Sequence, residues 1–323
     1  MVRDAKARPA SPDTHPSHVH GPPLMIFKPD EPATAPPRPA LCLATALLAG
    51  ACAANAVPAS ECARLCDLAW MAQASVAEVE AELDATPGAA TRANEYDITP
   101  LHRAAMANPD PRVADLLIAR GARLEARDAR GAAFSTRDPE VIERLLAHGA
   151  EVNATNRLGQ TPLHHAALGN DHPGVTATLL DHGAHLELRA HNTGATPLHA
   201  AAAGIALDTL ERLLERGADI AARDDAGATA LHIAAMGRIP EMAQALIDAG
   251  AALESTDAEG RTPLLAALDA GSPTVALRPL RAGADIAATD HAGETARTLF
   301  EANRWLHHRW SPRHAAALAR LLE

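Results

Sequence analysis

Aromatic side chains are scarce in this chain. Only three Trp, three Phe and one Tyr occur among its 323 residues, although 47% of the residues are hydrophobic. Alanine and leucine supply most of the rest. Such small side chains argue against a deep interior anchored on aromatic rings and favour thin layers of closely packed helices. The length suffices for two average domains or for one long repeat array.

Basic residues are also few. The 29 Lys and Arg residues are outnumbered by 40 Asp and Glu residues, which gives a net charge of −11. Nucleic-acid-binding proteins usually present a basic face. The charge therefore argues against a nucleic-acid partner and leaves neutral proteins as candidates.

The first 56 residues have a composition of their own. Residues 1–39 are rich in Pro, His, Ala and Asp without an apolar period, so they are a disordered leader or a misassigned start, with Met25 as the alternative initiator. Residues 40–54 carry no charge and are too few to span a bilayer comfortably. They match the apolar core of a secretory signal, and Ala54-Asn55-Ala56 is an A-x-A cleavage pattern. Residues 40–56 are therefore predicted to be a signal peptide, the alternative being a buried core helix.

The cysteines suggest two further processing events. Ala49–Cys52 loosely resembles a bacterial lipobox, in which Cys52 would carry a lipid anchor, but its first residue is Ala instead of the usual Leu. Simple export is therefore the preferred interpretation. Cleavage after Ala56 would leave Cys62 and Cys66, one helical turn apart, and an oxidising compartment favours a disulfide between them. The alternative is two small, buried hydrophobic side chains.

A repeated motif occupies most of the remaining chain. The string TPLH occurs at residues 99–102, 161–164 and 196–199, and variants follow at Thr229, Thr262 and Thr295, each 33 residues after the previous one. A Gly-Ala pair, preceded by two leucines or similar residues, follows each time. Its glycines are Gly121, Gly149, Gly183, Gly217, Gly250 and Gly283.

This pattern resembles the ankyrin repeat over about residues 65–323. The resemblance implies an all-α solenoid of helix-turn-helix units joined by hairpin fingers, with capping repeats at both ends. In each unit Thr caps the first helix, Pro occupies its first turn, and the motif His is implied to hydrogen-bond neighbouring loops. We assign residues 57–93 to N-terminal capping helices, 94–292 to the repeats and 293–323 to a C-terminal capping repeat.

Two repeats depart from the pattern. Gly131 to Gly149 spans 18 residues where the neighbouring repeats need 23 or 24, and this second repeat lacks TPLH. Its first helix must be truncated or replaced by a turn, either as a tolerated deletion, which we favour, or as a notch for a partner. In the sixth repeat, Pro279 lies within the second helix and is expected to kink or shorten it.

Seventeen histidines raise the question of a metal site. The motif histidines recur once per repeat, and neighbouring helices are roughly 8–10 Å apart, too far to share a zinc ion with bonds of ~2 Å. His307 and His308 are adjacent and point apart on a helix. No G-x-S-x-G, Walker-type loop, H-E-x-x-H or zinc-type cysteine spacing is present. We therefore predict no catalytic, cofactor-binding or metal site.

Recognition is then the expected role. The resemblance implies a concave face lined by the finger tips and the outer ends of the first helices. The tips mix both signs of charge, so they create no steering field of one sign. The candidate partner contacts are Tyr96, Arg103, Arg130, Arg157, Leu158, His165, Asn192, Asp225, Ile233, Met236, Glu259 and His291.

The leading prediction is a monomeric, non-catalytic protein–protein interaction scaffold, exported to the bacterial periplasm or secreted, without a transmembrane span. Two alternatives stay open. One is an intracellular, cytoplasmic ankyrin effector or regulator, in which the apolar stretch is no signal. The other is an accessory subunit that supports a periplasmic enzyme. An export reporter separates the first alternative from the leading prediction, and a pull-down separates the second.

Overall fold

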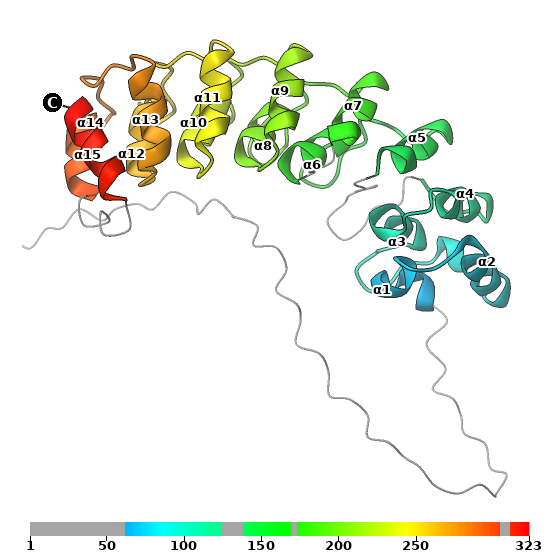
Figure 1. Ribbon diagram of the computed structural model, residues 1–323. Helices are drawn as coiled ribbons and strands as arrows, with labels where there is room; N and C mark the ends of the chain where they lie inside the picture. Colours follow the sequence, from blue (N-terminus) through cyan, green and yellow to red (C-terminus); the bar gives the residue numbers. More distant parts are fainter. Residues whose placement is uncertain (1–61, 125–137, 170–172, 304–310, 323) are drawn as a thin grey trace, which may run out of the picture. The chain divides into compact units, whose positions relative to one another are not determined.

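The computed structural model describes residues 62–124, 138–169, 173–303 and 311–322 (Figure 1). Several sequence predictions lie outside these residues. They concern the leader 1–39, the signal segment 40–56, Arg130, the first helix of the short second repeat and the Trp305–Trp310 segment. None of the helices in the described ranges has the length and apolar composition needed to cross a bilayer.

Two kinds of helix alternate along the chain. The N-terminal elements are η1 (Ala63–Cys66), α1 (Leu68–Met71), α2 (Val76–Ala85) and η2 (Ala89–Thr91). The first helices of the repeats are α3 (Pro100–Ala107), α6 (Pro162–Gly169), α8 (Pro197–Ala203), α10 (Ala230–Met236), α12 (Pro263–Asp269) and α14 (Ala296–Ala302). The second helices are α4 (Arg112–Ala119), α5 (Pro139–Ala147), α7 (Pro173–Asp181), α9 (Leu207–Glu215), α11 (Pro240–Asp248), α13 (Pro273–Arg281) and α15 (Pro312–Leu321).

The helices stack in chain order (Figure 1). From α6 to α14 each first helix contacts the first helix of the next repeat, and from α4 to α15 each second helix contacts the next second helix. The two helices of a repeat also contact each other, as in α8 with α9 and α10 with α11. The described residues contain no β-strand apart from an isolated bridge between Thr289 and Thr295. The expected all-α repeat solenoid is confirmed.

Leucine and alanine fill the space between the helices. The motif leucines Leu163, Leu198, Leu231 and Leu264 are at most 1% exposed, and so are Leu179, Leu213 and Leu246 on the second helices. Small residues let neighbouring helices approach closely. At Gly204, directly after α8, an added Cβ would lie 2.6 Å from the Leu168 carbonyl oxygen, so only glycine fits there.

Each motif threonine caps a first helix. At Thr196 the histidine three residues later completes a capping box: the Thr196 backbone N–H donates to Nδ1 of His199 at 3.2 Å, and the threonine hydroxyl lies 2.9 Å from the same nitrogen. The same arrangement occurs at Thr99, Thr161 and Thr229. Because Nδ1 accepts a backbone N–H, the ring proton resides on Nε2.

That proton links one repeat to the next. Nε2 lies 3.1 Å from the Ala195 carbonyl oxygen in His164, 3.1 Å from that of Ala228 in His199, and 2.9 Å from that of Arg261 in His232. Burial is the largest effect on all three rings and lowers the pKa of each below its ordinary value. This series of histidine hydrogen bonds between repeats ends at the sixth repeat, where the fully buried Leu265 replaces the motif histidine.

One expectation about helix length was wrong. The helix α13 contains Pro279, yet it runs nine residues, as do α9 and α11. An interior proline removes one helix hydrogen bond, and its ring crowds the carbonyl four residues earlier. The carbonyl of Pro279 nevertheless accepts the Ala284 N–H at 2.9 Å at the end of the helix. The ring is also buried in the core. Packing on both neighbouring helices therefore maintains the full length despite the missing hydrogen bond.

Candidate partner-binding face

Six tight turns precede the first helices. Each is closed by a backbone hydrogen bond of 2.9–3.1 Å from the N–H of its first residue to the carbonyl of its last. We call them the finger turns: residues 94–98, 156–160, 190–195, 224–228, 257–261 and 290–294. We call the exposed side of these turns, together with the exposed side of the first helices, the finger face.

Side-chain oxygens shape the turns. The Oδ1 atom of Asp224 accepts the N–H groups of Ala226 and Ala228, both at 2.9 Å, and Asn94, Asn156, Asp257 and Asp290 act in the same way. The fourth residue of these turns takes a positive φ, which suits glycine, as at Gly227 (φ 72°). In the first turn Asp97 occupies this position with φ 58°, and no other described non-glycine residue has a positive φ.

The last five finger turns are joined to one another. Backbone N–H groups of His191, Asp225, Ala258 and His291 donate to carbonyls of the preceding turn at 2.6–2.9 Å. Contacts this close leave little room for a side chain at Gly159, Gly194 and Gly260: a Cβ on Gly159 would lie 2.4 Å from the His191 ring. The five turns therefore form a fixed row of exposed tips.

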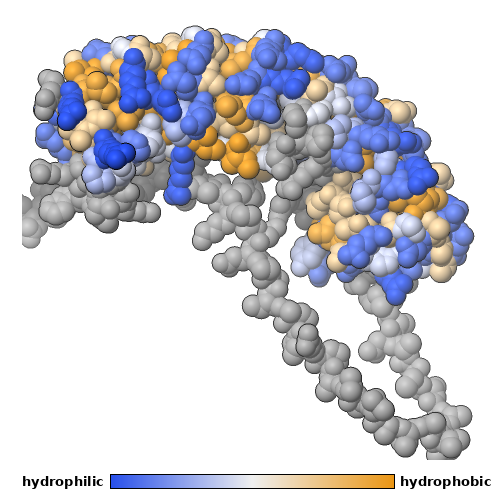
Figure 2. All heavy atoms as spheres, viewed as in Figure 1, coloured by the Kyte–Doolittle hydropathy of each residue, from blue (hydrophilic) through white to orange (hydrophobic). Residues whose placement is uncertain are grey.

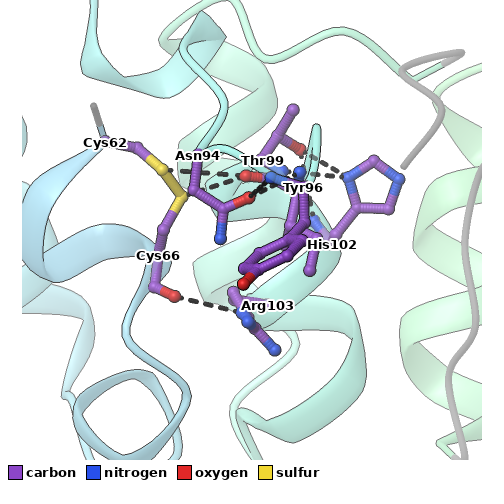
Figure 3. The surroundings of a disulfide bond; sticks show 8 residues. Cys62, Cys66, Asn94, Tyr96, Thr99, His102 and Arg103 are labelled. Atoms are coloured by element: carbon purple, nitrogen blue, oxygen red, sulfur yellow. Dashed lines mark hydrogen bonds between the residues drawn. A yellow bond between two sulfur atoms is a disulfide. The ribbon is translucent and has the colours of Figure 1, made fainter. Parts of the chain in front are cut away.

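The first finger turn is held by the N-terminal elements instead. The sulfur atoms of Cys62 and Cys66 lie at bonding distance, with their Cα atoms 5.5 Å apart. Both sulfurs face the Ile98 carbonyl oxygen, at 3.7 Å and 3.2 Å. The Arg103 Nε donates to the Cys66 carbonyl at 3.0 Å (Figure 3). A disulfide has no S–H to donate, so the cysteine pair packs against the end of the turn that carries Tyr96 without a hydrogen bond from sulfur.

The structure places eleven of the twelve candidate contacts; Arg130 lies outside the described residues. Tyr96 is 58% exposed and Leu158 is 41% exposed. Arg157, Asn192, Asp225, Glu259 and His291 are also exposed at finger tips, whereas Arg103, His165, Ile233 and Met236 are half-buried on the first helices. The eleven are spread over the row of repeats, so they line a surface rather than a single pocket.

Several candidates already have partners within the chain. Asp225 pairs with Arg189 at 3.0 Å, and Glu259 pairs with Arg261 at 3.2 Å. His165 Nε2 lies 3.2 Å from the side-chain amide nitrogen of Asn156. Such exposed ion pairs stabilise a protein little, because water and salt screen them, so they remain available to a binding partner.

Sequence reasoning missed several exposed hydrophobic residues, of which Ile205 is the most exposed. Ile205, in the turn between α8 and α9, is 70% exposed, more than any other large hydrophobic side chain in the described part. The only signal was its position, directly after Gly204 and outside the repeat motif. An isoleucine so exposed on a first-helix turn belongs among the candidate contacts.

The described residues show no cluster of three or more His, Cys, Asp or Glu side chains that could hold a metal ion. The motif histidines are occupied by backbone groups on both ring nitrogens in His164, His199 and His232. They therefore act as structural links between repeats.

Comparison with known protein families gives a consistent result. A model described as ankyrin repeats (3 copies) matches residues 131–224 and 204–290, and a model of the single ankyrin repeat matches residues 96–129. No curated protein matches the chain. The matched segments include the four middle finger turns whole, residues 96–98 of the first turn and only residue 290 of the last. This chain belongs to the ankyrin-repeat family, whose members are generally non-catalytic scaffolds that bind other proteins.

Proposed function

We propose that this chain is a scaffold that binds a protein partner through its finger face in the bacterial periplasm. The observation that carries the binding site is the fixed row of turns from 156–160 to 290–294, because backbone hydrogen bonds hold its tips in place before any partner arrives. A surface ordered in advance loses less conformational entropy on binding. Exposed Tyr96 and Leu158 supply the aromatic and apolar area from which interface hot spots are built.

The cellular location rests on two features of the N-terminal part. Residues 40–54 form an uncharged run followed by the A-x-A pattern at Ala54–Ala56. Cys62 and Cys66, which follow that site, have their sulfurs at bonding distance, and disulfides persist mainly in oxidising compartments. Both features support export followed by cleavage.

A reporter fusion and N-terminal sequencing test the location. We expect a reporter that is active only outside the cytoplasm to be active, and the mature chain to begin at or near Val57. A lipid on Cys52 would indicate an anchored form instead. A full-length cytoplasmic product would contradict export and leave the intracellular effector as the explanation.

Site-specific photocrosslinking tests the binding face. A photoreactive amino acid at Asn192, an exposed finger-tip residue, should capture a protein in cells. The same amino acid at Glu215, which is exposed on the second helix α9, is the matched control and should capture none. Capture from Glu215 alone would place the binding surface on the second helices.

A further inference from the structure

An apolar strip lies open on two neighbouring first helices. Ala203 and Ile205 are exposed at the end of α8, and Ile233 and Met236 are half-buried on α10, which contacts α8. Figure 2 shows hydrophobic residues exposed at the lower edge of the array, where α8 lies. Because Ile205 is 70% exposed, burying it against a partner would remove a large apolar area from water.

The charge of the finger turns changes along the row, from turns without carboxylates to acidic turns. The turns 156–160 and 190–195 contain no carboxylate. The turns 224–228, 257–261 and 290–294 contain one arginine, Arg261, and six carboxylates: Asp224, Asp225, Asp257, Glu259, Asp290 and Glu294. The tips therefore mix both signs over the whole row, as the sequence indicated, but the last three turns are acidic.

Internal pairing offsets only part of this negative charge. Arg261 contacts Asp257, Glu259 and Asp269, the last of which ends α12. Arg189 contacts Asp225. Arg223, directly before the turn 224–228, donates to the carbonyls of Gly227 and Thr256. The turns 224–228 and 257–261 carry four carboxylates beside Arg189, Arg223 and Arg261, so a small excess of acidic charge lies at the turns that precede α10 and α12.

The two features fit one kind of ligand. The helix α8 has seven residues, so the finger turns and Ile205 are separated by about 10 Å along the helix axis. A helix with its side chains is roughly 10–12 Å wide. A single helical segment that lies across the repeats can therefore contact the finger turns and the apolar strip at the same time.

We propose that the strip on α8 and α10, with the acidic turns 224–228 and 257–261 beside it, binds a cationic amphipathic segment of a partner protein. Leucine-type side chains of that segment cover Ile205 and Met236, and its lysines or arginines lie along Asp225 and Glu259. This proposal rests on the scaffold function and adds the chemistry of the partner. A second copy of this chain is a poor occupant, because its net charge of −11 would repel the acidic turns.

A labelled synthetic peptide tests the proposal. The probe is a helix-forming peptide of leucine and lysine with the leucines on one face, and its binding to the full chain is measured by fluorescence anisotropy at low and high salt. The reference is the same peptide with glutamate in place of lysine. We expect the lysine peptide to bind, the binding to weaken with salt, and the glutamate peptide not to bind.

Matched variants separate this site from general charge attraction. Ile205→Ser should weaken lysine-peptide binding by about tenfold, since burying an isoleucine is worth that much, whereas Ile286→Ser, at another exposed isoleucine, should not. The pair Asp225→Asn and Glu259→Gln should weaken binding, whereas Glu211→Gln and Glu215→Gln on α9 should not. Thermal unfolding of every variant checks the fold.

Three outcomes overturn the proposal: no binding of the lysine peptide, equal binding of both peptides, or equal losses in the control variants. The scaffold function would survive any of them if photocrosslinking at Asn192 still captured a protein. The partner would then be recognised by different chemistry.

Discussion

The Nε2 atom of His199 lies 3.1 Å from the carbonyl oxygen of Ala228, the last residue of the next finger turn. Because Nδ1 of the same ring accepts the Thr196 N–H, one side chain caps its own helix and holds the turn of the following repeat. The ring is only 3% exposed, so water does not replace either bond. His164 and His232 repeat the arrangement, which makes these side chains the polar links of the solenoid.

Replacing His199 should lower the free energy of unfolding without changing any side chain of the finger face. His199→Ala leaves a buried carbonyl and a buried N–H unpaired, at a cost of ~1–3 kcal/mol. Urea unfolding measures the loss. His185→Ala is the control, since His185 is exposed and should change stability by less than about 0.5 kcal/mol. Equal effects of the two changes would show that the buried bonds of His199 contribute nothing.

The same histidines predict a sensitivity to acid. Burial lowers the pKa of His164, His199 and His232 in the folded chain, whereas the unfolded chain has a histidine pKa near ~6.5. The unfolded state therefore binds more protons below that pH, and stability should be full above pH ~7 and fall as the pH drops through ~6.5. Each residue adds a slope of up to about 1.4 kcal/mol per pH unit. In unfolding curves at several pH values, His199→Gln should have a smaller slope than the unchanged chain, and an unaltered slope would refute the assignment.

The cysteine pair should be oxidised in protein from the native compartment. Cys62 and Cys66 are both buried, and their Cα separation of 5.5 Å is ordinary for a disulfide. Mass spectrometry without reduction should find the mass two hydrogens below that of the dithiol. The double change to serine should lower stability by about 2 kcal/mol, the value for so short a loop. Two free thiols in such protein would contradict the pairing.

The first finger turn offers a test of backbone strain. Asp97 has φ 58°, where most side chains collide with the backbone but Asp and Gly are tolerated. Asp97→Gly should stay within about 0.5 kcal/mol of the unchanged chain, whereas Asp97→Val should destabilise it by ~1–2 kcal/mol. Thermal unfolding distinguishes the two. Equal stability of both variants would mean that this turn adopts another conformation in solution.

The repeat period predicted most of the fold, because each motif residue has a local reason for its place. Thr99 caps, the following proline begins the helix, and Gly121 ends the second helix at φ 90°. The role of the motif histidine also followed from the family resemblance. The full length of α13 around Pro279 did not, because packing against its neighbours outweighs one lost hydrogen bond. Ile205 was missed as well, since its exposure depends on how the α8–α9 turn is placed and not on any sequence period.

The central claim is that the finger face binds a protein, and one panel of variants tests it most directly. Tyr96→Ala and Arg157→Ala change exposed tips, so both should stay within about 0.5 kcal/mol of the unchanged chain. Half-buried Met236→Ala should unfold somewhat earlier. The measurement is partner capture by each variant, alongside Glu215→Ala on the opposite helix layer as the control. We predict that the three face variants capture less partner than the unchanged chain and that Glu215→Ala captures as much; undiminished capture by all three, with the control alone reduced, would contradict the account.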